Sequence, residues 1–333
     1  MTRHRGQLAL VSILAIAFLA TVIWAITEKP WRRAGEDTTV SAAAFQPPPD
    51  SAIPNNEFGE MVREGKKIFA NPGQYASGFV GNKLSCVNCH LSDGRQANSA
   101  PLWAAYVAYP AYRSKNEHVN TFAERLQGCF QYSMNGKAPP LGDRTLVALE
   151  SYAYFLAKGV PTGEPPAGRG YPALPAPALA ADYNRGAAVY SQNCAVCHGA
   201  NGEGKSSDGH AAFPPLWGAQ SYNWGAGLTA IDTAAAFVRA NMPLGMPNSL
   251  TVQQAWDVAT YIDSQVRPQD PRFTGDVAQT RKQFHDSPYS AYGTTVNGVL
   301  LGAPDHTPPF GTVPVSTSGT PAHATGATHD EQS

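Results

Sequence analysis

The chain has 333 residues, of which 43% are hydrophobic and 15% are charged, and its formal net charge at pH 7 is -1. A nearly neutral chain offers no basic surface for a nucleic acid or an anionic lipid, so neither is expected as a partner. The length is sufficient for two small domains.

An apolar segment, residues 8–26, opens the chain and follows Arg3 and Arg5. Its length is close to the ~20 residues that cross a bilayer as a helix. The preceding positive charges would keep the N-terminus in the cytoplasm. Residues 1–33 are therefore predicted to contain an N-terminal transmembrane helix that anchors the protein on the periplasmic side of the inner membrane. A cleaved signal peptide, which would release the protein into the periplasm, is the alternative.

Proline-rich segments divide the rest of the chain, because such segments favour extended linkers over packed structure. The C-terminal end is rich in Thr, Pro, Gly and Ser and is predicted to be disordered. The predicted order after the anchor is a tether at 34–54, a first domain at 55–159, a linker at 160–182, a second domain at 183–268, an extension at 269–303 and a disordered tail at 304–333.

Four of the five cysteines lie in two copies of the motif CxxCH. Two thiols one helical turn apart can bond to the vinyl groups of one porphyrin, and the adjoining imidazole can bind the iron. A zinc site or a redox-active cysteine pair is the alternative, but a histidine directly after both pairs favours haem. The sequence thus predicts two covalently bound haem c groups. Their attachment residues are Cys86, Cys89, Cys194 and Cys197, and their first iron ligands are His90 and His198.

The two segments that carry these motifs are repeats of each other. Gly65 and Gly186 open similar pentapeptides before each motif, and Pro-Leu-Trp follows each motif, ending at Trp103 and Trp217. The order helix, CxxCH, loop, helix, ligand loop and helix is that of a small cytochrome c domain. The predicted fold class is therefore all-α, with two tandem class I cytochrome c domains joined by the Pro-rich linker and preceded by the transmembrane helix.

The repeat also suggests the second ligand of each iron. Met242 precedes a proline and ends a predicted helix, which is typical of a thioether ligand. Cys129 follows Trp103 at almost the same spacing as Met242 follows Trp217, so it occupies the corresponding place in the first domain. Met246 and Met134 are the alternative ligands, and Cys129 is alternatively a buried small hydrophobe.

Basic residues surround Cys129 in the sequence. A capping box, Thr121 to Glu124, is predicted to open a helix that ends near Gly128. Arg125 lies four residues before Cys129, so the two would share one face of this helix. Arg113, Lys115 and Lys137 lie in the flanking loops, and together these charges indicate an anionic substrate.

The run NSAPLWAAYVAYPAYRSKNEHVNTFAERLQGCFQYSMNGKAPP, with the later RANMPLGMP, resembles the thiosulfate dehydrogenases, which are periplasmic dihaem cytochromes c. The resemblance covers about residues 55–268. It implies that His90 and Cys129 bind a catalytic haem 1, that His198 and Met242 bind an electron-transfer haem 2, and that Arg125 binds an anion. Some relatives carry a ligating lysine where this chain has Asn241.

What the resemblance implies for function is the oxidation of two thiosulfate ions to tetrathionate, which is reversible in some members. Electrons would pass from haem 1 to haem 2 and then to a cytochrome c or a membrane oxidase. Cys129, Arg125, Arg113 and Lys137 are the predicted catalytic residues. A dihaem electron carrier without catalytic activity and a dihaem cytochrome c peroxidase are the alternatives; the carrier would need neither Cys129 nor the basic loops.

Overall fold

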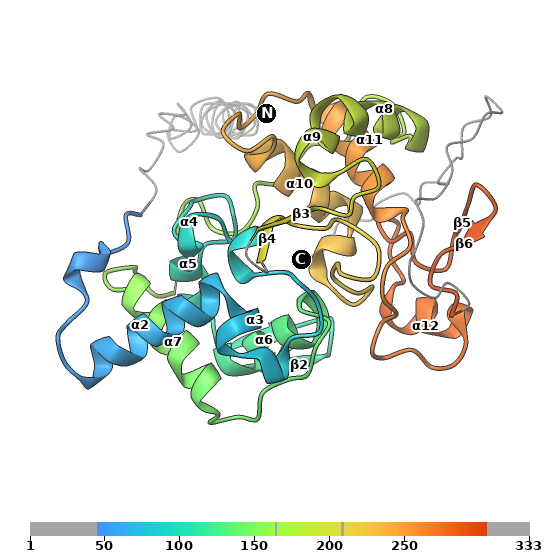
Figure 1. The fold of residues 1–333 in the computed structure, drawn as a ribbon. Coiled ribbons are helices and arrows are strands. Elements are labelled where there is room, and N and C mark those ends of the chain that lie inside the picture. The colour runs from blue at the N-terminus through green and yellow to red at the C-terminus, as the bar shows by residue number, and fades with distance from the viewer. Residues whose placement is uncertain (1–44, 164, 208–209, 305–333) are drawn as a thin grey trace, which may run out of the picture. The chain divides into compact units, whose positions relative to one another are not determined.

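The computed structural model describes residues 45–163, 165–207 and 210–304 (Figure 1). The predicted membrane segment at 8–26 and nearly all of the predicted tail at 304–333 lie outside these residues, as does most of the predicted tether. The described end of the tether, residues 45–54, packs on the first helical group, where Asp50 Oδ1 accepts a 2.6 Å hydrogen bond from Arg95 Nη2.

The first helical group surrounds the first CxxCH motif. Its core contains Trp103 and Tyr152, which are both fully buried. Its helices are α2 (Glu57–Ala70), α3 (Pro72–Tyr75), α4 (Leu91–Gly94), α5 (Leu102–Val107), α6 (Phe122–Gly128) and α7 (Arg144–Leu156). Short 3-10 turns form at η2 (Asp50–Ala52), η3 (Ser77–Phe79) and η4 (Cys86–Asn88), and a π-helical turn, η5 (Cys129–Ser133), follows α6.

The second helical group surrounds the second motif and repeats this plan with fewer helices. Trp217 and Trp224 lie in its core, each at most 2% exposed. Its helices are α8 (Tyr183–Asn193), α9 (Ala195–His198), α10 (Ile231–Asn241) and α11 (Val252–Asp263), with a 3-10 turn at η6 (Gly227–Thr229).

One glycine in each group lets the first long helix cross the last one closely. A Cβ at Gly65 of α2 would lie 2.0 Å from the carbonyl oxygen of Ala148 in α7, and a Cβ at Gly186 of α8 would lie 2.0 Å from that of Asp257 in α11. Because real Cβ atoms do not approach an oxygen this closely, only glycine fits at either crossing. The repeat read from the sequence is confirmed at this contact.

The extension after the second group is folded. It contains α12 (Val277–Phe284) and a two-stranded hairpin, β5 (Thr295–Val296) and β6 (Val299–Leu300). Tyr292 and Leu301 are fully buried in the core of the second group, and His285 stacks on Tyr292 with ring centroids 4.2 Å apart. The extension is therefore part of the same packed unit as the helices.

The described residues are mostly helical, as predicted, and three short antiparallel pairs of strands accompany the helices. Each strand has only two to four residues, too short for an alternating apolar pattern to stand out in the sequence. Besides β5 and β6, the strands are β1 (Ala111–Arg113) with β2 (His118–Asn120), and β3 (Lys205–Ser207) with β4 (His210–Phe213).

The fold class is corrected at the predicted transmembrane helix, which is not part of the described structure. Among residues 45–304, apart from the gaps given above, no helix has the length and hydropathy needed for a membrane span. The longest of them, α2, has 14 residues. Such a helix is roughly 21 Å long, which is less than the ~30 Å thickness of a hydrocarbon core.

Candidate functional site

The first candidate site lies where α6 continues into the turn η5. The predicted capping box of α6 is confirmed: Thr121 Oγ1 accepts from the Glu124 amide at 3.2 Å, and Glu124 Oε2 accepts from the Thr121 amide at 2.6 Å. α6 ends at Gly128 as predicted, but the chain does not turn away there, because Cys129 keeps helical angles of φ -65° and ψ -45° and begins the turn η5. The side chains on either side of this junction consequently stay on one face.

Arg125 and Cys129 meet on that face. Arg125 Nη1 lies 2.9 Å from Cys129 Sγ in hydrogen-bonding geometry. The charge of Cys129 raises the pKa of the Arg125 guanidinium. A cysteine sulfur that accepts a hydrogen bond from a fixed cation is well placed to bind a metal or to attack an electrophile.

A cavity adjoins this pair and brings together five of the predicted site residues. It is lined by Cys86, Cys89, His90, Arg125 and Cys129. The remaining lining is mainly apolar and includes Phe69, Leu102, Phe122, Phe130, Leu149 and, from the second helical group, Tyr222, Ala226 and Leu228. Mainly apolar walls with a few convergent polar groups are typical of a cofactor site.

The thiols of the first motif face this cavity from η4. Ser85 and Asn88 form a capping box around the turn, and the Ser85 amide donates to Asn88 Oδ1 at 2.7 Å. Burial raises the pKa of Cys86 above its usual range and that of Cys89 to about 12. Both sulfurs are therefore neutral thiols at neutral pH, and both are free of disulfides.

His90 is held in one orientation by the segment that joins the two helical groups. Its Nδ1 lies 2.6 Å from the carbonyl oxygen of Ala100, and the Ala100 amide donates to Gly170 O at 2.8 Å. Ala100 has φ 45°, in a region that non-glycine residues rarely occupy. Burial lowers the pKa of His90 to about 4, so the imidazole is neutral.

These residues fit a haem c group. With Nδ1 engaged by a carbonyl oxygen, His90 carries its proton on that nitrogen and presents Nε2 as a free donor atom, which is how metal-binding histidines are oriented. His90 and Cys129 line the same cavity, so one nitrogen and one sulfur ligand are available there. Cys86 and Cys89 line it too and supply the two thiols that a c-type haem requires.

The second motif repeats this chemistry. His198 Nδ1 lies 2.9 Å from the carbonyl oxygen of Pro214, and burial lowers the pKa of this histidine. Burial raises the pKa of Cys194 to about 12. The indole Nε1 of buried Trp217 has no hydrogen-bond partner among the described residues. A buried donor without a partner calls for an acceptor from a bound group, which a haem carboxylate would supply.

The two methionines that compete for the second site differ in burial. Met242 caps the end of α10 and packs against the core of the second group, whereas Met246 is 60% exposed. In the first site, Met134 is 3% exposed and lines the cavity together with Cys129. The geometry favours Met242 over Met246, and Cys129 over Met134 because only Cys129 is paired with a cation.

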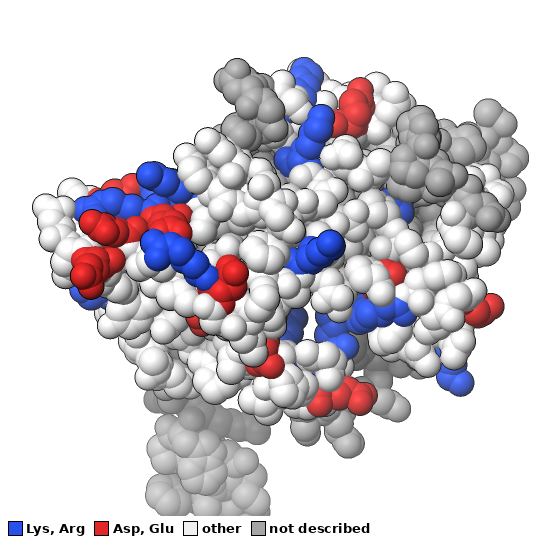
Figure 2. Space-filling view, turned by 60° about the horizontal axis from the view of Figure 1, so that its bottom comes forward, with Lys and Arg blue, Asp and Glu red and all other residues white. Residues whose placement is uncertain are grey.

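The predicted basic residues differ in whether they line a pocket. Arg113 lines an open pocket together with Lys115, and Arg113 Nη1 donates to Tyr109 Oη at 2.6 Å. Lys137 is exposed and lines neither the cavity of the first motif nor the pocket of Arg113. Figure 2 shows basic side chains on both sides of a hollow in the surface.

Sequence reasoning missed two residues near this site, Tyr132 and Arg272. The Arg272 guanidinium carbon lies 5.1 Å from the centre of the Tyr132 ring, although Arg272 belongs to the C-terminal extension. Tyr132 is close to Cys129 along the chain, but an aromatic residue beside a ligand is more often core. For Arg272 the sequence holds no local signal, because only the folded extension brings it to η5.

Direct hydrogen bonds join the two helical groups, close in sequence to the candidate ligands of both sites. Buried Asn241, which precedes Met242, accepts from Gln96 Nε2 at 2.9 Å and donates through Nδ2 to Asn98 O at 2.9 Å. Gln96 and Asn98 lie in the loop that follows His90. Elsewhere, Asn223 Nδ2 donates to Gln131 O at 2.9 Å.

Comparison with known families covers both helical groups. The family model described as SoxA/TsdA, cytochrome c domain, matches residues 74–162, and the model described as cytochrome c matches residues 183–265. Both helical groups are therefore cytochrome c domains, and the protein binds haem c.

Whole-chain comparisons agree with this assignment. The thiosulfate dehydrogenase of Thiomonas intermedia (strain K12) is 62% identical over 262 residues, 79% of this chain and 83% of that protein. The thiosulfate dehydrogenase of Stutzerimonas stutzeri (strain A1501) is 48% identical over 279 residues, 83% of this chain and 89% of that protein.

A solved structure is also similar. Thiosulfate dehydrogenase (TsdBA) from Marichromatium purpuratum, in its "as isolated" form, matches with a TM-score of 0.76 and 51% identity. The match covers 78% of this chain and 58% of that chain, so the protein spans little more than half the length of the solved chain. On these identities and coverages, the chain belongs to the thiosulfate dehydrogenase family.

Proposed function

We propose that this protein is a dihaem c-type cytochrome that oxidises thiosulfate to tetrathionate. Two S₂O₃²⁻ ions join through a new sulfur–sulfur bond to give one S₄O₆²⁻ ion and two electrons, so atoms and charge balance without a proton or a water molecule. The relatives that carry the name thiosulfate dehydrogenase support this substrate. Tetrathionate is the product expected when two thiosulfate ions are joined through a sulfur–sulfur bond.

The single observation that carries the proposal is the contact between Arg125 and Cys129 in the cavity of the first motif. Arg125 Nη1 lies 2.9 Å from Cys129 Sγ, and Cys86, Cys89 and His90 line the same cavity. A protein that only carried electrons would need neither a cysteine nor a buried arginine at this place. Both groups suit a reaction in which a sulfur atom of an anion approaches another sulfur.

Basic side chains near this cavity would offset the repulsion between two dianions. Arg125 stands at Cys129, and Arg113 and Lys115 line the open pocket formed by residues 108–109 and 111–115. Positioned cations stabilise negative charge more strongly at a partly buried site than in water. Lys137 is exposed and would contribute only to the long-range attraction of the substrate.

Each of the two domains would have its own role. Residues 55–159 would hold the catalytic site, with His90 and Cys129 as iron ligands, and residues 183–268 the electron-transfer site, with His198 and Met242. The two haems, when bound, would each accept one electron, which matches the two electrons of one turnover. Residues Cys86, Cys89, Cys194 and Cys197 would hold them covalently.

The location that fits this chemistry is the periplasmic side of the inner membrane. Covalent haem attachment needs reduced CxxCH thiols that are exported before the haem is added. The electron acceptor would be a soluble cytochrome c or a membrane oxidase. A fractionation of cells that express the full chain, followed by haem staining, would test the location.

Steady-state assays of the purified holoprotein test the function. Thiosulfate with ferricyanide as acceptor should give tetrathionate with a stoichiometry of one product per two substrates, and tetrathionate with a low-potential donor measures the reverse direction. A pyridine haemochrome assay should give two haems per chain. Electron exchange without tetrathionate formation would show that the protein is a non-catalytic carrier instead.

A further inference from the structure

The C-terminal extension contacts η5, the turn that begins with Cys129, through one arginine. It lies beyond residue 265, where the second family model ends. The guanidinium carbon of Arg272 lies 4.3 Å from the centre of the Phe284 ring, which belongs to α12 of the same extension. It lies 5.1 Å from the ring of Tyr132 in η5, three positions after Cys129. Arg272 thus contacts an aromatic ring of the extension and one of the candidate active site.

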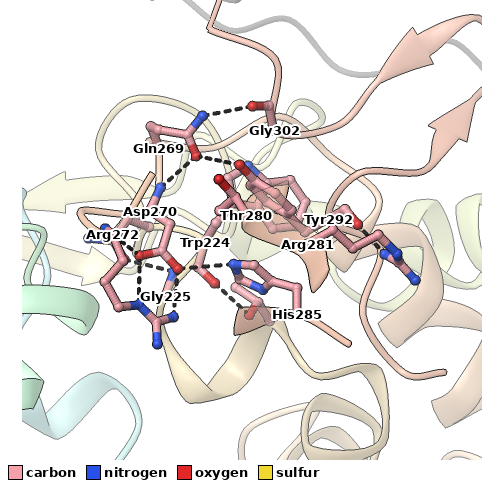
Figure 3. Close-up of polar contacts among 12 residues, drawn as sticks. Trp224, Gly225, Gln269, Asp270, Arg272, Thr280, Arg281, His285, Tyr292 and Gly302 are labelled. Atoms are coloured by element: carbon pink, nitrogen blue, oxygen red, sulfur yellow. Dashed lines mark hydrogen bonds and ion pairs between the residues drawn. The ribbon is translucent and has the colours of Figure 1, made fainter. Parts of the chain in front are cut away.

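A buried acidic residue fixes the arginine in this place (Figure 3). Arg272 Nε donates to Asp270 Oδ1 at 3.0 Å, and Arg272 Nη2 donates to Asp270 Oδ2 at 2.7 Å. His285 Nε2 lies 3.0 Å from the same Oδ2. Burial opposes ionisation of Asp270, but the hydrogen bonds from His285 and Arg272 hold the pKa of this carboxyl below its usual range.

One nitrogen of the Arg272 guanidinium is not engaged by Asp270. Arg272 Nη1 makes no hydrogen bond to any residue that the structure describes, although the other guanidinium nitrogens are engaged. The Arg272 side chain is 17% exposed, whereas the Asp270 side chain is completely buried. Asp270 thus fixes a partly exposed arginine that still has a free N–H donor, and such a guanidinium binds oxyanions well.

A second cation lies on the same aromatic ring. Lys115 Nζ is 4.3 Å from the centre of the Tyr132 ring and donates to the carbonyl oxygen of Gly225. Burial, together with the positive charges of Arg272, Arg125 and Arg113, lowers the pKa of Lys115 to about 8.

The charges near Lys115 do not cancel. Asp270 is the one acidic group among the causes of its pKa shift, and Asp270 is already paired with Arg272. Cations repel one another when they gather without matching acids, and a bound anion relieves that repulsion.

We propose that Arg272 and Lys115 form a binding site for the sulfonate end of a thiosulfate ion beside Tyr132. This inference rests on the proposed function. The sulfonate oxygens accept hydrogen bonds from Arg272 Nη1 and from the Lys115 ammonium, which leaves the terminal sulfur of the ion free to approach Cys129. The C-terminal extension is then part of the active site and determines the affinity for dianions.

Kinetics of the full-length holoprotein test this assignment. Replacing Arg272 with Gln should raise the KM for thiosulfate by about tenfold to about a hundredfold, the expected loss for a hydrogen bond to a charged group, and change kcat by less than about twofold. Lys282→Gln is the matched control, because it removes an exposed cation from α12 in the same extension, and its KM should stay at the wild-type value. Arg272→Lys keeps the charge without the bidentate pair and should give an intermediate KM.

Sulfate, a redox-inert dianion, separates this inference from the proposed function. It should raise the melting temperature of the wild type and of Lys282→Gln, but not of Arg272→Gln. If wild-type protein fails to oxidise thiosulfate while sulfate still protects it through Arg272, the function is wrong and the anion site stands. If Arg272→Gln keeps both the wild-type KM and the sulfate protection and only melts earlier, Arg272 is a structural brace and the inference is overturned.

Discussion

Arg125 Nη1 lies 2.9 Å from Cys129 Sγ, across a junction where an α-helix continues as a π-helical turn. The continuation matters because a chain break after Gly128 would have rotated the sulfur away from the guanidinium. The capping box of Thr121 and Glu124 fixes the start of the same helix. The position of the sulfur is thus set by local backbone structure, and its hydrogen-bond donor is one neighbouring side chain.

Replacing Cys129 with Gly should leave a folded protein with both haems, because neither motif nor either core is altered. Thiosulfate oxidation should fall by about a hundredfold or more, since a group that reacts directly is lost. The low-spin thiolate signal in electron paramagnetic resonance should disappear. Met134→Leu, in the same cavity, is the control and should keep both properties. A wild type without this signal, whose haem 1 spectrum changes in Met134→Leu and not in Cys129→Gly, would make Met134 the ligand instead.

Replacing Met242 with Leu should abolish the near-infrared band of a thioether bound to ferric iron and lower the reduction potential of the second haem. Leucine keeps the apolar volume against the core, so folding should be retained. Met246→Leu should change neither property, because Met246 is 60% exposed. The reverse pattern would show that the loop after α10 is arranged differently around the iron.

Replacing Gly65 with Ala should destabilise the first domain by about 1–3 kcal/mol, because overpacking forces α2 away from α7. The added Cβ would lie 2.0 Å from the carbonyl oxygen of Ala148. Gly73→Ala is the control: its Cβ would meet nothing closer than 3.9 Å, so stability should be unchanged or slightly higher. Urea denaturation of the holoprotein, followed by haem absorbance, measures both; equal midpoints for the two variants would refute the tight crossing.

Thiosulfate affinity should fall as pH rises through about 8. Burial lowers the pKa of Lys115 to about 8, so the ammonium is present below this pH and becomes a neutral amine above it. A neutral amine no longer attracts a dianion, and KM should increase on the alkaline side. Lys115→Arg should remove this change, because arginine stays protonated. A KM profile that is flat from pH 7 to pH 9 in the wild type would contradict it.

Much of the site was predictable because its chemistry is local in the sequence. Each CxxCH motif places two thiols and an imidazole within five residues, and a spacing of four places Arg125 beside Cys129 on a helix. Lys137 was expected nearby for the same reason, but its side chain is exposed and lines neither pocket, while its amide donates to Phe79 O. That bond joins segments far apart in the chain.

The parts that sequence reasoning missed depend on such distant contacts. Arg272 reaches Tyr132 only because the extension packs on the second core through Tyr292 and Leu301. The strands β1 to β6 escaped notice because pairs of two to four residues leave no periodic signal.

The hydrogen bonds of Asn241 bear on the rate of the proposed electron transfer from one domain to the other. This amide ties the end of α10 to Gln96 and to Asn98 at 2.9 Å each, and its neighbour Met242 begins the ligand loop of the second domain. Electron tunnelling weakens steeply with distance, so a pair of domains that swung apart would pass electrons only during brief encounters. The Asn241 hydrogen bonds keep the two loops at one separation, so the rate of the proposed electron transfer between the two domains should not depend on solvent viscosity.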